Sequence, residues 1–159
     1  MKTPAAGFLV FVLAVLSLAA CDRKEKPSAL ETPATSVKAV PPFYYDLGSP
    51  IADVSGYPES QKANYRFFLG VCGSCHTTAR PLNSPYVEAD VWKRYVQRMH
   101  HKMKGRGIEL DKVDEGRIID FLVYDSKIRK TDRRKEFDEQ QKQLRNFFET
   151  MAKEANAKR

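Results

Sequence analysis

The sequence predicts an all-α protein, with a small helical domain between an N-terminal extension and a C-terminal helix. Apolar residues after residue 60 recur at steps of three and four, which is the spacing of a helix that buries one face. No stretch shows the strict alternation of apolar and polar residues that marks a half-buried strand. With 159 residues and 42% apolar content, the chain can form one modest domain with appendages, and not two substantial cores.

The first 20 residues have the pattern of a bacterial export signal. The basic residue Lys2 precedes an apolar run over residues 5–16, which is shorter than the roughly 20 apolar residues of a membrane span. Leu18-Ala19-Ala20-Cys21 resembles the lipobox of bacterial lipoproteins, and this resemblance implies cleavage before Cys21 and acylation of its thiol and its new amino group. The alternative is an ordinary signal peptide with a cysteine near its end. Either pattern argues against a cytosolic enzyme.

Residues 21–57 are predicted to be a flexible tether. Prolines at positions 27, 33, 41, 42 and 50 interrupt this stretch, and Ser, Thr, Ala and charged residues fill most of the rest. Such a stretch buries too little apolar surface to fold alone. The exception is Phe43-Tyr44-Tyr45, whose rings we expect to pack onto the domain, a loose contact point being the alternative.

The first helix of the domain is predicted over residues 60–72, where Tyr65, Phe68 and Val71 fall at helical spacing. Pro81 and Pro85 then predict a loop over residues 79–85.

A second helix is predicted to start with Asp90 as its N-cap and to stop at Gly105-Arg106-Gly107. A third begins near Asp111, with acidic residues in its first turn, where the helix dipole favours them. The second helix presents one apolar face: Trp92, Val96, Met99 and Met103. The buried stripe of the third is predicted to be Val113, Ile118, Phe121 and Leu122.

Residues 127–159 are predicted to form a charged amphipathic helix. They carry eleven basic and six acidic side chains, whereas residues 21–125 carry 15 basic and 14 acidic ones. The sequence leaves open whether this helix packs on the domain, binds a partner or contacts anionic headgroups. Its apolar residues recur at helical spacing: Phe137, Leu144, Phe148 and Met151.

The segment Cys72-Gly73-Ser74-Cys75-His76 has the C-x-x-C-H spacing of a c-type haem attachment motif. Two thiols one helical turn apart can bond to the two vinyl groups of one porphyrin, and His76 then lies under the iron as the proximal ligand. The small residues between the cysteines let the backbone pass close to the porphyrin edge. The sequence therefore predicts one covalently bound haem c at Cys72 and Cys75, with His76 on the iron.

Three other interpretations of these cysteines compete with the haem. A thioredoxin-type redox pair requires a strand–helix–strand setting, which this region lacks. A zinc site requires further ligands, and His100 or His101 could offer one. A structural disulfide is allowed outside the cytoplasm, although so short a loop would constrain the chain little.

Over residues 58–126 the order of elements resembles a class I c-type cytochrome, in which a small helical domain is wrapped around one haem. The run from Trp92 to Met99, followed by Ile118-Ile119-Asp120-Phe121-Leu122, is similar to the small monohaem cytochrome subunits of periplasmic dehydrogenases, including sulfite dehydrogenases. This resemblance implies that Met99, seven residues after Trp92, is the distal iron ligand.

Three residues after Met99 keep the choice of distal ligand open. Met103 lies on the same predicted helix face as Met99, and either methionine could instead fill the core. His100 or His101 would make a bis-imidazole haem of lower reduction potential, because thioether ligation raises the potential.

The function that these features predict is a membrane-tethered periplasmic electron carrier with His/Met ligation and no catalytic residue of its own. One alternative is a haem enzyme with an open distal site, peroxidase-like, or a haem-based gas or redox sensor. The other is a structural or redox-thiol lipoprotein without haem.

The expected partners are redox proteins, including a periplasmic or inner-membrane oxidoreductase of which the chain could be the cytochrome subunit, and no nucleic acid. Asp22 resembles the inner-membrane retention signal of some lipoproteins, which favours the inner membrane. A basic cluster predicts docking on an acidic redox partner, a solvated helix face being the alternative. The cluster consists of Lys93, Arg94, Arg98, Lys102, Lys104 and Arg106.

We expect Cys21→Ser to release the domain from the membrane fraction into the soluble fraction, because the substitution removes the thiol that would carry the lipid. Fractionation of cells followed by immunoblotting measures this. Unchanged membrane attachment would show that another anchor holds the protein.

Overall fold

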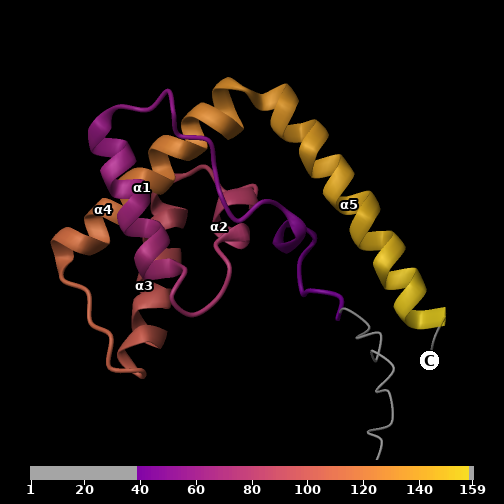
Figure 1. Ribbon diagram of the computed structural model, residues 1–159, viewed down its shortest axis with the longest axis horizontal. Helices are drawn as coiled ribbons and strands as arrows, with labels where there is room; N and C mark the ends of the chain where they lie inside the picture. Colours follow the sequence, from indigo (N-terminus) through magenta and orange to yellow (C-terminus); the bar gives the residue numbers. More distant parts are fainter. Residues whose placement is uncertain (1–38, 158–159) are drawn as a thin grey trace, which may run out of the picture. The chain divides into compact units, whose positions relative to one another are not determined.

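The computed structural model describes residues 39–157, and every regular element within them is helical (Figure 1). The all-α prediction is therefore confirmed for this part of the chain, which belongs to one compact unit, Val37–Arg159. The predicted signal peptide, Cys21 and the first part of the predicted tether lie outside the described residues. The elements are the 3-10 turn η1 (Tyr44–Leu47), α1 (Glu59–Cys72), α2 (Ala79–Asn83), α3 (Ala89–Lys104), α4 (Lys112–Asp125), the π-helix η2 (Ser126–Asp132) and α5 (Arg134–Ala157).

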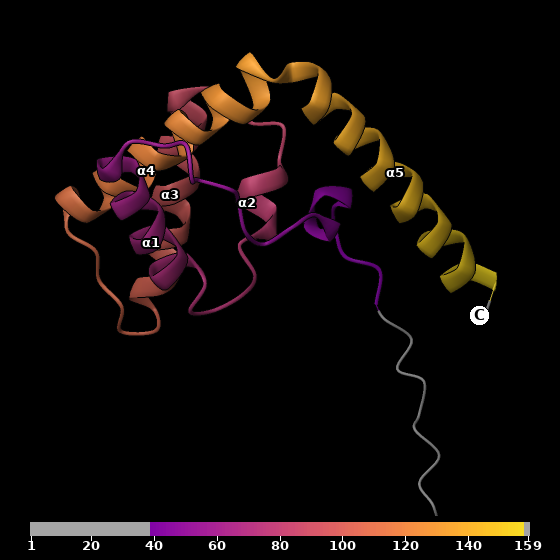
Figure 2. The same ribbon diagram turned by 45° about the horizontal axis from the view of Figure 1, so that its top comes forward.

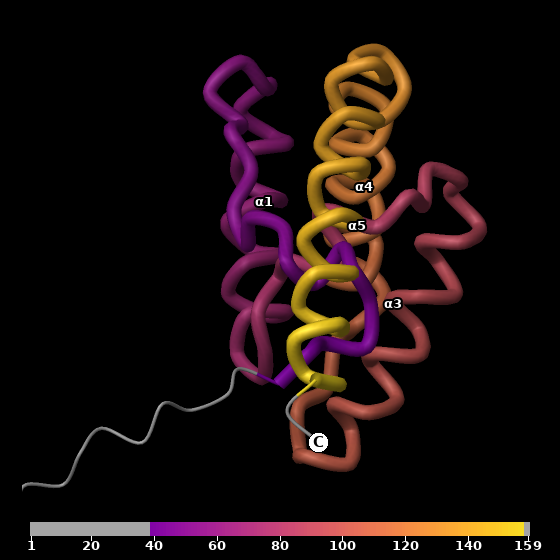
Figure 3. The backbone as a smooth tube through the Cα atoms, turned by 90° about the vertical axis from the view of Figure 1, so that its right-hand side faces the viewer, coloured from indigo at the N-terminus to yellow at the C-terminus, as the bar shows by residue number. Residues whose placement is uncertain are grey.

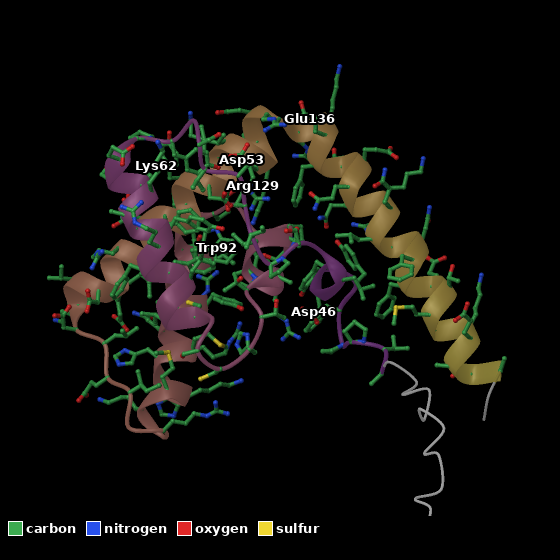
Figure 4. All side chains as sticks on the ribbon, viewed as in Figure 1. Asp46, Asp53, Lys62, Trp92, Arg129 and Glu136 are labelled. Atoms are coloured by element: carbon green, nitrogen blue, oxygen red, sulfur yellow. The ribbon has the colours of Figure 1, made fainter. Side chains whose placement is uncertain are left out.

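The core forms where α4 packs against both α1 and α3 (Figure 3). Phe121 of α4 is fully buried, with its ring centroid 5.1 Å from that of Phe68 and 5.0 Å from that of Tyr65, both on α1. Trp92 of α3 is fully buried as well and lies inside the helical cluster in Figure 4. This packing sets the C-terminal end of α1 beside α3.

The predicted first and third helices are confirmed. The second helix has a different N-cap from the predicted one, and one predicted core residue of the third helix is exposed. Asp111 caps α4 as predicted, accepting a hydrogen bond from the Asp114 N–H at 2.8 Å. The N-cap of α3 is Glu88, and Asp90 lies inside its first turn. Val113 is wrong as a core residue, because it is 72% exposed. It precedes Ile118 by five residues, which turns it about 140° away around the helix axis.

The predicted loop over residues 79–85 is wrong at its start, where the structure has α2. Pro81 is the third residue of this helix. The first backbone N–H groups of a helix have no partner within it, so a proline there removes no hydrogen bond.

The turn after α3 follows the prediction that Gly105-Arg106-Gly107 stops the helix. Gly107 has a φ of +75°, in the left-handed region that favours glycine. The Gly107 N–H then donates to the Lys104 carbonyl at 3.0 Å, and the Ile108 N–H donates to the Met103 carbonyl at 3.1 Å. These two bonds form a Schellman motif.

The predicted tether extends less far than residue 57. Tyr45 of η1 is buried, as the packing prediction for its aromatic segment required. Asp46 accepts two hydrogen bonds of 2.7 Å from the Arg80 guanidinium, and the Tyr65 hydroxyl accepts one of 2.9 Å from the Ala52 N–H. These long-range hydrogen bonds fix much of residues 43–57 against the helices. Local composition does not reveal them, because the partners are far apart in the chain.

The predicted helix over residues 127–159 is divided into η2 and α5, with a break at Arg133 (Figure 2). Asp125, at the junction, is fully buried and receives hydrogen bonds of 2.7 and 2.6 Å from Arg129 and one of 3.0 Å from the Tyr57 hydroxyl. The first turns of α5 pack on the rest of the unit through Phe137 and Gln141, both buried. No helix within residues 39–157 is long and apolar enough to cross a membrane.

Lys130 of η2 is 3% exposed, and its Nζ donates hydrogen bonds of 3.3 Å to the carbonyls of Pro81 and Tyr86. Burial lowers the pKa of this amine from 10.5 to about 7. The unfolded chain therefore binds a proton between pH 7 and 10 that the folded chain does not, and folding is favoured as the pH rises through this window.

We compare the free energy of unfolding of the native chain with that of Lys130→Met. The native value minus the variant value should rise by up to about 1.4 kcal/mol per pH unit between pH 7 and 9. Urea unfolding of both proteins at several pH values measures this. The matched control is Lys127→Met, on the same π-helix but with a side chain 70% exposed, which should leave the slope unchanged. Parallel pH profiles for the native chain and Lys130→Met would contradict the expectation.

Candidate functional site

A mostly apolar, open pocket of about 130 Å³ lies where α1 ends beside α3. Cys72, Cys75 and His76 line it from the α1 side, and Met99 and Met103 line it from α3. In Figure 4, sulfur atoms gather between the C-terminal ends of these two helices. The structure thus brings together all five residues that the sequence predicts for the site.

The turn after α1 places the two thiols differently. Gly73 donates its N–H to the Leu69 carbonyl at 2.9 Å, and a Cβ at this position would collide with that same oxygen. Ser74 Oγ donates to the Val71 carbonyl at 2.8 Å and lies 3.7 Å from Cys75 Sγ. Cys72 ends up half-buried and Cys75 exposed, and both thiols are free.

The environments of the two thiols move their pKa values in opposite directions. Burial raises the pKa of Cys72 to about 12. A hydrogen bond from Ser74 and the neighbouring Arg106 guanidinium hold the pKa of Cys75 below its ordinary value. Near neutral pH, Cys75 therefore has the larger thiolate fraction.

His76 is exposed, and its ring is oriented by the backbone. The Nδ1 atom lies 2.8 Å from the carbonyl oxygen of Thr77, which can only accept a hydrogen bond. The proton of the neutral ring is thus on Nδ1, and the lone pair of Nε2 is available to a metal. A backbone carbonyl that holds the other ring nitrogen is a common arrangement for metal-binding histidines.

The two methionines occupy different places on the pocket wall. Met103 is 9% exposed and faces the main pocket and, together with Met99, a smaller apolar one of about 20 Å³ between α1, α3 and α4. Met99 is half-buried and also borders a wider, more polar hollow that His76 lines. Met99 therefore shares two hollows with His76, and Met103 shares one.

The two alternative histidines are placed away from the pocket in different ways. His100 Nε2 accepts a hydrogen bond of 3.1 Å from the Leu110 N–H, and its Nδ1 pairs with Glu115. Because Leu110 N–H can only donate, the ring proton is on Nδ1, and neither nitrogen offers a free lone pair. His101 is exposed and does not line the main pocket.

The predicted basic cluster divides into paired and pocket-lining residues. Arg94 pairs with Asp90, and Lys104 pairs with Glu109 at 2.7 Å. Lys93 is exposed on α3. The cations that line the pocket or the adjoining hollow are Arg98, Lys102 and Arg106.

Sequence reasoning missed Tyr95 and Pro81 as contributors to the pocket and named Arg106 only as a member of the basic cluster. Tyr95, which is 7% exposed, lines it from α3, and its position four residues before Met99 is a signal that could have found it. Pro81 lines it from α2, and Arg106 contacts it as the neighbour of Cys75. No local pattern indicates either, because both approach through the tertiary fold.

Within residues 39–157, no group of three or more His, Cys, Asp or Glu side chains is arranged to hold a metal ion. Comparison of the chain with protein-family models, curated proteins and solved structures finds no match.

We expect iodoacetamide to alkylate Cys75 of the haem-free chain at least about a hundred times faster than Cys72 at pH 7.5, because the thiolate is the reactive form. Peptide mass mapping over time measures both rates. Arg106→Gln should slow the reaction of Cys75, whereas Lys102→Gln, another pocket-lining cation, is the matched control and should not. Equal rates at the two cysteines would contradict the expected difference.

Proposed function

We propose that this protein is an electron carrier with one c-type haem bonded to Cys72 and Cys75. The observation that carries the proposal is the donor set of the pocket: two free thiols, an imidazole with an available Nε2 and two thioethers line one mostly apolar hollow.

These residues fit such a group by their chemistry. Cys72 and Cys75 would hold the porphyrin edge through two thioether bonds, and His76 would bind the iron through Nε2. When bound, the haem iron supplies reversible one-electron oxidation and reduction. The chain contributes the ligands, the exclusion of water by Tyr95 and its apolar neighbours, and the surface on which a partner docks.

Met99 is the proposed distal ligand, ahead of Met103. The support is that Met99 borders both hollows that His76 lines, while Met103 borders one of them and is more deeply buried. If His76 and Met99 both bound the iron, no position would be left for a substrate. The donor set thus favours a carrier over a peroxidase-like enzyme or a gas sensor.

The proposed partners are acidic redox proteins, which the protein would meet while it is anchored to a membrane. Arg98, Lys102 and Arg106 border the pocket, so a partner attracted to them would approach the cofactor itself. Lipidation of Cys21 would hold the protein at the periplasmic face of a membrane, the inner membrane being favoured. The proposed family is that of class I-like monohaem c-type cytochromes, in a lipoprotein form, and the chain could serve as the cytochrome subunit of an oxidoreductase.

We expect haem to stay with the polypeptide through acid–acetone extraction, because thioether bonds survive this treatment and coordination bonds do not. The test is made on the full chain, produced in a host that matures c-type cytochromes. Cys72→Ala together with Cys75→Ala should abolish covalent haem. Haem released into the acetone phase, or a colourless protein, would refute the proposal and favour a redox-thiol or structural lipoprotein.

We expect Met99→Ala to abolish the weak far-red sulfur-to-iron band of the ferric protein and to lower the reduction potential, because the thioether raises it. Met103→Ala is the matched control, one turn further along α3, and should keep the band. The reverse result would assign the distal position to Met103. Persistence of the band in both variants would show that the two sulfurs can replace each other.

A further inference from the structure

His100 joins three parts of the chain around the end of α3. Its Nε2 accepts the N–H of Leu110, in the segment between α3 and α4, and its Nδ1 donates to the Glu115 carboxylate on α4. The imidazole side chain is only 16% exposed, and the Glu115 side chain 20%. A side chain with both nitrogens engaged on two other segments restricts the rotation of the helix that carries it.

The residues on either side of His100 are the two candidate thioethers. Met99 precedes it, and Met103 follows one turn later, with its carbonyl accepting the Ile108 N–H at 3.1 Å. His100, Met99, Met103 and Leu110 also line the same small apolar pocket between α1, α3 and α4. Any rotation or fraying of the last two turns of α3 therefore moves both sulfur atoms.

The same end of α3 forms one other ion pair in this region, with the segment that precedes α4. Lys104 pairs with Glu109, but the two side chains are 55% and 72% exposed, and such a surface pair contributes little. The His100 hydrogen bonds are partly buried, and leaving the Leu110 N–H or the Glu115 carboxylate without a partner there costs free energy. His100 is thus the main polar link between the end of α3 and α4.

We infer that His100 is a positioning residue, not a ligand: by linking α3 to Leu110 and Glu115, it fixes the rotation at which Met99 faces His76 across the pocket. This inference rests on the proposed function for the role of Met99, and on the structure alone for the placement of the sulfurs. It predicts that removal of the imidazole ring changes which methionine sulfur faces His76 and how exposed both sulfurs are, while Cys72, Cys75 and His76 keep their positions.

The test uses four variants of the full chain. His100→Ala removes both hydrogen bonds, and Glu115→Gln weakens one of them. His100→Gln is the conservative variant, since its amide can accept from the Leu110 N–H and donate to Glu115. His101→Ala is the matched control, because His101 is the next residue and is exposed.

In the haem-loaded protein, we expect His100→Ala to lose the far-red band or weaken it about tenfold and to lower the reduction potential, as expected when a buried hydrogen-bonded link is removed. Glu115→Gln should have a smaller effect in the same direction, and His100→Gln should restore the band. His101→Ala should match the native chain. An unchanged band and potential in His100→Ala would overturn the inference. A bis-histidine spectrum in the native protein that is lost in His100→Ala would overturn it as well, because His100 would then be a ligand.

A second measurement separates this inference from the proposed function. In the haem-free chain, peptide mapping after exposure to hydrogen peroxide reports how fast Met99 and Met103 become sulfoxides. His100→Ala should raise both rates by about tenfold, since the end of α3 opens more often, with Met151 on α5 as an internal reference. Rates unchanged by His100→Ala would overturn the inference even if haem is bound. A native chain without covalent haem but with the expected rates would refute the function and retain the positioning role.

Discussion

The packing of Phe121 against α1 is the contact on which the rest of the structure depends. Phe121 and Phe68 are both fully buried, 5.1 Å apart, and they join α4 to α1 while α4 also packs on α3. The C-terminal ends of α1 and α3 meet as a result, and the pocket lies where they meet. Loss of such an aromatic contact would remove a large share of the buried apolar surface of so small a core.

A buried polar network holds the other end of the unit. Asp125 pairs with Arg129 and accepts from Tyr57, and Arg129 also donates to the Leu82 carbonyl at 2.8 Å. These bonds tie the π-helix to α2 and to the segment before α1. They matter for the pocket because Pro81, on α2, forms part of its wall.

Electrostatics divide the site into two halves. Burial in the apolar interior raises the pKa of Cys72, while the Ser74 hydroxyl and Arg106 at the edge lower the pKa of Cys75. The two thiols of one motif are therefore unequal before any cofactor is attached. Lys102 and Arg106 line the pocket, so the more acidic thiol lies close to positive charge.

The sequence by itself determined the helical class, the end of α1, the cap of α4 and the C-x-x-C-H segment that lines the pocket. All of these depend on contacts within one or two helical turns, so periodicity, capping residues and the C-x-x-C-H spacing were sufficient. Only the tertiary structure decided the rest. The pairing of Asp46 with Arg80, 34 residues apart, the entry of Pro81 into the pocket wall and the link from His100 to Glu115 all depend on which helix faces meet. Local patterns carry no information on these contacts, because segments distant in the chain approach each other only when the core closes.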